Sequence, residues 1–105
     1  MITDFNLNSE SMSTALAVAS LVVIDFWAPW CSHCIAMNLE LEELAANYTG
    51  NVMLGKVNVD AEKTLARSYG VMSIPTLIFF RNGTEIKRLN GVHTAQELAD
   101  LLNTL

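Results

Sequence analysis

The chain has 105 residues, which corresponds to one domain at about 100–150 residues per domain. Apolar residues make up 51% and charged residues 16%, a composition that is typical of a folded domain and excludes intrinsic disorder. The net charge is −5, and residues 1–55 carry six carboxylates but no Lys or Arg. The length predicts a single domain over residues 1–105. No basic patch is available, so we expect that this domain does not bind nucleic acid.

The first half of the chain has the features of neither a membrane anchor nor a secretory signal. The apolar stretch Ala15–Ile24 is interrupted by Ser20 and is shorter than the ~18–20 residues that span a bilayer. A secretory signal begins with a basic segment, whereas the first basic residue here is Lys56. We therefore expect a cytoplasmic protein without a membrane partner.

The first half of the sequence predicts two strands that alternate with two helices. A weak strand over Ile2–Phe5 precedes a helix capped by Asn8 or Ser9. Leu21–Trp27 is apolar on both alternating faces, which is typical of a central strand covered on both sides. Residues 34–48 then form the clearest amphipathic helix, with an apolar stripe of Cys34, Met37, Leu41, Leu44 and Tyr48.

A third strand and a short helix follow. The apolar run Val52–Val59 predicts the strand, and Asp60 is a candidate cap for a helix that continues to about Ser68. Gly70 is well suited to end that helix, because glycine readily takes the left-handed conformation found after helix ends.

The C-terminal third predicts a hairpin and a last helix. A buried strand, Thr76–Arg81, is joined by Asn82-Gly83 to a strand over Glu85–Leu89, and Asn-Gly between two apolar runs is a strong hairpin signal. Residues Thr94–Glu97 have the pattern of a capping box, which opens a helix that runs to Leu102.

The order of these elements, β-α-β-α-β-α-β-β-α, predicts an α/β fold. Strands that are linked through helices run parallel, and the closing hairpin is antiparallel, so the central sheet is mixed. Helices cover both faces of the sheet. The sequence therefore predicts a three-layer α/β/α sandwich.

Both cysteines lie in one segment, Trp30–Cys34, where the central strand ends and the amphipathic helix begins. A Cys-x-x-Cys pair in this βα context is typical of a redox-active dithiol, and the two residues lie close enough for a disulfide. Cys31 lies at the positive end of the helix, which favours its thiolate, whereas Cys34 lies on the apolar stripe and is shielded. We therefore predict that Cys31 attacks a target disulfide and that Cys34 resolves the mixed disulfide.

Three other interpretations of the pair have less support in the sequence. A zinc site needs two more ligands. The chain offers only His33, which is wedged between the two cysteines, and His93, so we expect no metal. Attachment of haem c requires His at position 35, which is Ile35. A purely structural disulfide would close too short a loop to stabilise the fold much.

The sequence resembles the thioredoxin family over roughly residues 20–105. The motifs that carry this resemblance occur in the thioredoxin order and spacing: residues 25–31 (DFWAPWC), 56–60 (KVNVD), 69–71 (YGV), 74–76 (IPT), 82–83 (NG) and Gly91. The resemblance implies a thioredoxin-like sandwich.

Asp25 lies on the same face of its strand as Leu21, Val23 and Trp27, which predicts a desolvated carboxyl with a raised pKa. The alternative is that Asp25 only caps the next turn. The resemblance to thioredoxins implies a role in proton transfer beneath Cys34, with Lys56 as its neighbour.

The resemblance also implies a docking surface for substrate. The Ile74–Pro75 bond is expected to be cis and to face the cysteine pair, so that the backbone of Ile74 can pair with a bound substrate strand. Trp30, Gly91 and Val92 would complete a flat apolar surface beside it.

The sequence departs from the thioredoxin pattern at several positions. Ser32-His33 stands in place of the usual Gly-Pro, and Met72-Ser73 in place of Arg-Gly. A partly protonated His33 would stabilise the Cys31 thiolate and make the pair more oxidising. The alternative is that His33 is exposed and has no electrostatic effect. We expect Met72 to fill the core or its rim.

The predicted function is that of a thiol–disulfide oxidoreductase that reduces protein disulfides through Cys31 and Cys34. The resemblance implies a monomer without a bound cofactor that receives electrons from NADPH through a flavin-dependent thioredoxin reductase. Two alternatives stay open: a disulfide oxidase or isomerase, which His33 favours, and a non-catalytic binding subunit with a thioredoxin fold.

Overall fold

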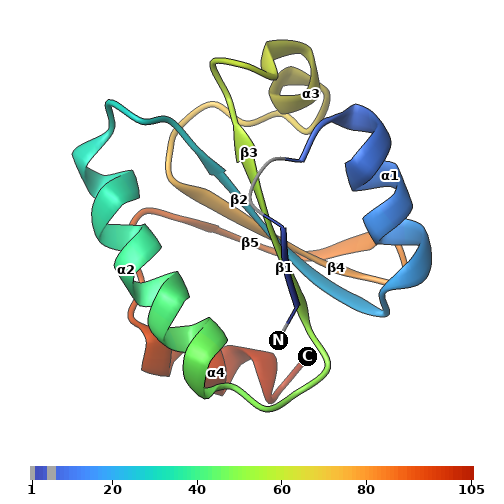
Figure 1. The fold of residues 1–105 in the computed structure, drawn as a ribbon, viewed down its shortest axis with the longest axis vertical. Helices are drawn as coiled ribbons and strands as arrows, with labels where there is room; N and C mark the ends of the chain where they lie inside the picture. The colour runs from blue at the N-terminus through green and yellow to red at the C-terminus, as the bar shows by residue number, and fades with distance from the viewer. Residues whose placement is uncertain (1, 5–6) are drawn as a thin grey trace.

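The described residues form five strands in one mixed sheet, in the order β1-β3-β2-β4-β5. The computed structural model describes residues 2–4 and 7–105, and Figure 1 shows its ribbon. Strands β1, β3 and β2 are parallel, whereas β4 runs antiparallel to β2 and β5 antiparallel to β4. The strands are β1 (Ile2–Asp4), β2 (Leu21–Trp27), β3 (Met53–Asn58), β4 (Thr76–Arg81) and β5 (Thr84–Asn90).

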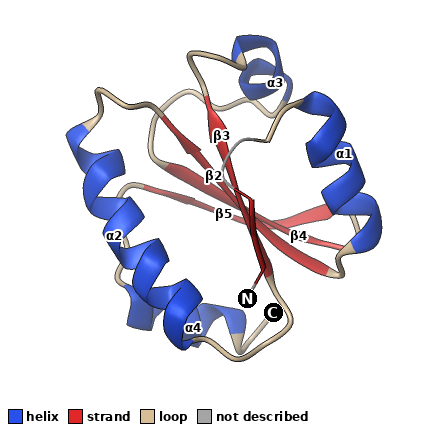
Figure 2. Ribbon diagram, in the orientation of Figure 1, coloured by secondary structure: helices blue, strands red, loops and turns tan. Residues whose placement is uncertain are grey.

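Among the described residues, four helices cover the two faces of this sheet. They are α1 (Ser9–Val18), α2 (Ser32–Asn47), α3 (Lys63–Ser68) and α4 (Ala95–Leu102). Figures 1 and 2 show α2 and α4 on one side of the sheet and α1 and α3 on the other. The predicted α/β/α sandwich is therefore confirmed. Within the described ranges, no helix is both long and apolar enough to cross a bilayer.

The alternation of side chains along β2 divides the core into two parts. Val23 packs with Met37 and Leu98 on the side of α2 and α4. Ile24 packs with Met12 on the side of α1 and α3. Because β2 is buried on both faces, a polar side chain in this strand has no access to water. Asp25 is such a side chain.

The helix predicted over residues 34–48 begins earlier than expected. It runs from Ser32 to Asn47, because the Cys31 side chain caps it and accepts a hydrogen bond from the Cys34 N–H. Val52 and Val59 lie just outside β3. Of the first predicted strand, Phe5 lies outside the described residues.

Asp60 does not cap α3, contrary to the prediction. The helix begins at Lys63, and its N-cap is Glu62. The backbone N–H of Asp60 instead donates to the side chain of Asn58 at 2.9 Å, which forms a turn before the helix. The carboxylate of Asp60 is thereby left to accept a hydrogen bond from Trp30. Gly70 ends α3 with φ +65°, as predicted.

The predicted hairpin turn and the predicted N-cap of the last helix are confirmed. Asn82 and Gly83 have φ values of 50° and 82°, the left-handed pair that a tight hairpin turn requires. The hydroxyl of Thr94 accepts the Glu97 N–H at 3.1 Å. The Glu97 carboxylate accepts a hydrogen bond from the Thr94 hydroxyl at 3.2 Å and contacts His93 Nδ1 at 3.1 Å.

Candidate active site

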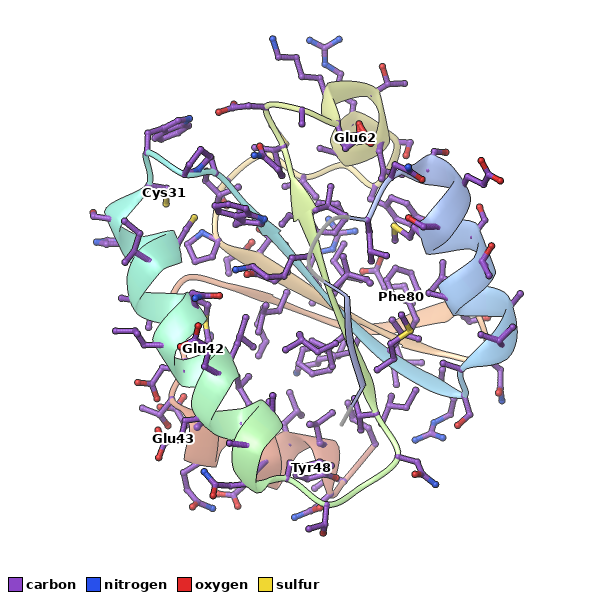
Figure 3. All side chains as sticks on the ribbon, viewed as in Figure 1. Cys31, Glu42, Glu43, Tyr48, Glu62 and Phe80 are labelled. Atoms are coloured by element: carbon purple, nitrogen blue, oxygen red, sulfur yellow. The ribbon has the colours of Figure 1, made fainter. Side chains whose placement is uncertain are left out.

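The two thiols lie where β2 ends and α2 begins, as Figure 3 shows for Cys31. Cys31 is the N-cap of α2, and its Sγ accepts the Cys34 backbone N–H at 3.2 Å. Both cysteines are free thiols. Cys31 is 8% exposed and Cys34 is 1% exposed, so the first sulfur has the better access to a substrate.

The electrostatic surroundings of the two sulfurs differ as much as their exposure. Cys31 Sγ lies at the N-terminal end of a 16-residue helix, which carries a partial positive charge, and it accepts the Cys34 N–H there. Burial raises the pKa of Cys34 to about 12, and its hydrogen bond with the Cys31 side chain contributes in the same direction. Cys34 is therefore almost entirely protonated at neutral pH.

Asp25 lies in β2, two residues before the end of the strand, and its side chain is fully buried. Neither carboxylate oxygen has a hydrogen-bond partner in the described part of the chain. Burial raises the pKa of Asp25 to about 7, and the positive charge of Lys56 opposes this rise. The Asp25 charge also contributes to the raised pKa of Cys34, so the two groups interact. The interpretation of Asp25 as a cap of the next turn has no support in these contacts.

Lys56 reaches Asp25 from the neighbouring strand β3, where the two residues are register partners. Its Nζ lies 3.8 Å from Asp25 Oδ2 and 4.6 Å from the centre of the Trp27 ring. The same Nζ donates a hydrogen bond to Asn38 Oδ1 of α2. Sequence reasoning did not single out Asn38, although its place one helical turn after Cys34 puts it beside the apolar stripe.

One of the predicted docking residues, Ile74, lies beside Cys31, and the next, Pro75, is hydrogen-bonded to Gly91. The Ile74–Pro75 bond is cis, and the Ile74 carbonyl oxygen lies 4.0 Å from Cys31 Sγ. The Gly91 N–H donates to the Pro75 carbonyl at 2.9 Å, which joins the loop after β5 to the start of β4. Pro75 itself is buried.

Two of the residues predicted for the docking surface are apolar and exposed. Trp30 and Val92 are 70% and 43% exposed. Met72 is 97% exposed, so the expectation that it fills the core or its rim is wrong. The Trp30 indole N–H donates to Asp60 Oδ2 at 2.7 Å, which fixes the ring, and no local pattern in the sequence predicts this contact.

His33 lies in the first turn of α2, two residues after Cys31, and is exposed. The structure therefore leaves its effect on the thiolate as a prediction.

Within the described ranges, no group of three His, Cys, Asp or Glu side chains is arranged to hold a metal ion.

Comparisons with known proteins place this geometry in a family. The thioredoxin family model matches residues 4–104. The chain belongs to the thioredoxin family. It is 40% identical to the thioredoxin of Chlamydia caviae over 92% of the chain and 93% of that protein. It is 37% identical to the thioredoxin of Staphylococcus aureus over 97% of the chain and 92% of that protein.

Solved thioredoxin structures have the same fold. A mutant thioredoxin from Halobacterium salinarum superposes with a TM-score of 0.89 at 26% identity, covering 98% of this chain and 89% of that one. Plasmodium falciparum thioredoxin gives a TM-score of 0.86 at 25% identity, covering 96% and 97%. With the cysteine pair of residues 31 and 34, the chain is a thioredoxin-type thiol–disulfide oxidoreductase. Enzymes of this type carry electrons on sulfur and need no bound cofactor.

Proposed function

We propose that this protein reduces exposed disulfides in other proteins, with Cys31 as the nucleophile and Cys34 as the resolving thiol. The observation that carries the proposal is the asymmetry of the pair. Cys31 caps α2 and accepts an N–H on its sulfur, whereas burial raises the pKa of Cys34 to about 12. Cys34 is protonated at neutral pH and is therefore a poor first nucleophile, because the thiolate is the reactive form.

The reaction has two sulfur-transfer steps. In the first, the Cys31 thiolate attacks one sulfur of the substrate disulfide, the substrate S–S bond breaks, and the leaving thiolate takes a proton from water. In the second, Cys34 loses its proton and attacks Cys31 Sγ, which releases the other substrate thiolate. The substrate gains two electrons, and Cys31 and Cys34 become a disulfide.

The second step needs a proton acceptor, because a thiol with a pKa of about 12 is almost entirely protonated at neutral pH. Asp25 supplies it in this proposal: burial raises its pKa to about 7, so a large fraction is ionised in the neutral range and can take a proton. The positive charge of Lys56 stabilises the ionised form. The proton then passes to the departing substrate thiolate.

Substrate binding is assigned to the surface around the cysteine pair. Trp30 and Val92 supply exposed apolar area, and Gly91 and Pro75 join the two loops that carry it. The backbone of Ile74 lies beside Cys31, where an extended substrate segment can pair with it.

The remaining parts of the proposal concern the setting of the reaction. Residues 1–105 act as one monomeric domain in the cytoplasm. The oxidised pair is reduced again by a flavin-dependent thioredoxin reductase that uses NADPH. The family relationship supports both the protein disulfide substrates and this electron donor.

His33 is the reason to expect that the Cys31–Cys34 couple has a higher reduction potential than a typical thioredoxin. An imidazolium two residues from Cys31 favours the thiolate, and stabilising the reduced form raises the reduction potential. We propose a potential of about −200 to −245 mV, between the values of roughly −270 mV for thioredoxin and −180 mV for protein disulfide isomerase. A potential near −180 mV would favour the oxidase or isomerase as the cellular activity.

The test mixes the reduced protein with a protein that has one accessible disulfide and counts the thiols released. We expect one substrate disulfide reduced per chain, with formation of the Cys31–Cys34 disulfide. The double variant Cys31→Ser, Cys34→Ser should reduce none. If this double variant still replaces the wild type in a complementation assay, the non-catalytic binding subunit is the better description.

A further inference from the structure

The side chain of Asn38 lies between two charged groups on the active-site side of the sheet. Its Oδ1 accepts a hydrogen bond from the Lys56 ammonium, and its Nδ2 donates to Glu42 Oε1 at 3.1 Å. Glu42 is one turn further along α2, where Figure 3 labels it. Because an amide has one donor end and one acceptor end, the carboxylate of Glu42 fixes the orientation that turns Oδ1 toward Lys56.

The sheet alone would bring the Lys56 ammonium onto Asp25. The two residues are register partners on adjacent strands, so their side chains stand on the same face of the sheet. Lys56 is only 6% exposed and Asp25 is fully buried, and an ammonium and a carboxylate in such a site attract each other strongly. The observed separation of 3.8 Å is nevertheless too long for a hydrogen bond, and among the described residues neither Asp25 oxygen has one.

We propose that Asn38 is a positioning residue that holds the Lys56 ammonium short of hydrogen-bond contact with Asp25, and so keeps Asp25 basic enough to take the proton of Cys34. This inference rests on the proposed role of Asp25 as the proton acceptor. A carboxylate that accepts a hydrogen bond from an ammonium is a weaker base, because the hydrogen bond stabilises its ionised form. The amide of Asn38 competes for that hydrogen bond.

The other groups that face Asp25 carry no positive charge that could stabilise its carboxylate in place of Lys56. On β4, the register partner of Asp25 is Leu77, which carries no charge. Cys34 of α2 interacts with Asp25, but burial raises the pKa of this thiol and keeps it neutral through the neutral range. The Cys31 side chain at the N-cap of α2 is hydrogen-bonded to Cys34. The position of the Lys56 ammonium therefore determines how much the ionised form of Asp25 is stabilised.

Two substitutions at residue 38 give opposite predictions. Asn38→Ala removes the competing acceptor and keeps the helix, since alanine is the best helix former. The Lys56 ammonium then moves onto Asp25, and the proton affinity of Asp25 falls at least threefold. Asn38→Asp holds the Lys56 ammonium more firmly and adds a negative charge. The proton affinity of Asp25 therefore rises. Asn47→Ala is the matched control, because Asn47 is on the same helix and its side chain donates to the Glu43 carbonyl, away from Lys56.

The experiment measures the Asp25 titration directly, by carboxyl ¹³C NMR of the reduced protein, with Asp25→Asn to assign the signal. We expect the midpoint to move down in Asn38→Ala, up in Asn38→Asp and not at all in Asn47→Ala. In a Lys56→Met background, Asn38→Ala should have no further effect. An unchanged or raised midpoint in Asn38→Ala, or the same shift in the Lys56→Met background, overturns the inference.

A second readout separates this inference from the proposed function. The pH dependence of mixed-disulfide resolution, measured in a single turnover, should move with the Asp25 midpoint in each variant. If the midpoint moves as expected and the rate profile stays in place, Asn38 does position Lys56, but Asp25 is not the acceptor of the Cys34 proton. If the midpoint does not move, the assignment of Asn38 is wrong whatever the rate profile does.

Discussion

Replacing Asp25 with Asn should make the protein more stable at neutral pH. Asp25 is fully buried, and within the described part of the chain neither of its oxygens accepts a hydrogen bond. Burial raises its pKa from an ordinary 3.8 to about 7. Between these two pH values the native state holds a proton that the unfolded chain has lost. The free energy of unfolding of the wild type therefore decreases as pH rises through this window.

The size of the effect follows from the pKa. Each tenfold change in the acid dissociation constant corresponds to about 1.36 kcal/mol. A rise in the pKa of Asp25 from 3.8 to about 7 therefore destabilises the native state by about 4 kcal/mol once the pH exceeds both values. Asn cannot ionise, so the variant lacks this destabilisation. Any pH-independent effect of the new amide cancels when the same pair of proteins is compared at two pH values.

Urea unfolding of both proteins at several pH values measures this difference. The stability of Asp25→Asn relative to the wild type should increase by about 3 kcal/mol between about pH 4.5 and pH 8, which is most of the ~4 kcal/mol total. The control is Glu43→Gln, since Glu43 is an exposed carboxyl on α2 and should give no such trend. A difference that does not depend on pH would place the Asp25 pKa near its ordinary value and would remove the basis for this prediction.

Two further predictions concern α2 and its surroundings. His33→Pro should lower the reduction potential by about 20–45 mV, which corresponds to 1–2 kcal/mol, as measured by equilibration with a glutathione buffer; an unchanged potential would show that His33 has no electrostatic effect. Glu40 accepts the Ala95 N–H at 2.8 Å and so caps α4 from another helix. Glu40→Ala should therefore lower the free energy of unfolding by about 1 kcal/mol, whereas Glu40→Gln, which keeps an acceptor oxygen, should lower it less; equal losses in urea unfolding would argue against the cap.

The sequence predicted the elements of the fold and the burial of Asp25 because both depend on local periodicity. The alternation along Leu21–Trp27 places Asp25 on the face of Leu21 and Val23, and those two residues do pack in the core beneath α2 and α4. The Asn82-Gly83 turn depends on backbone preferences of two adjacent residues. Such features need no knowledge of how distant segments meet.

The side-chain partners around the site could not be predicted in the same way. The contact of Lys56 with Asn38 joins β3 to α2 across 18 residues, and that of Trp30 with Asp60 spans 30 residues. Neither pair follows a period within one element, because each depends on how a helix or loop packs against the sheet. The wrong assignment of Asp60 as a helix cap has the same origin, since a tertiary contact uses the carboxylate that a local rule assigned to the helix.

The division of labour between the two cysteines can be tested by trapping. Cys34→Ser and Cys31→Ser are each incubated with a disulfide-containing protein, and mixed disulfides are counted by mass spectrometry without reductant. We predict that Cys34→Ser accumulates mixed disulfides through Cys31, because the attack proceeds and the resolution does not, whereas Cys31→Ser traps almost none. Comparable trapping by both variants would show that the burial and the raised pKa of Cys34 do not prevent that residue from attacking first.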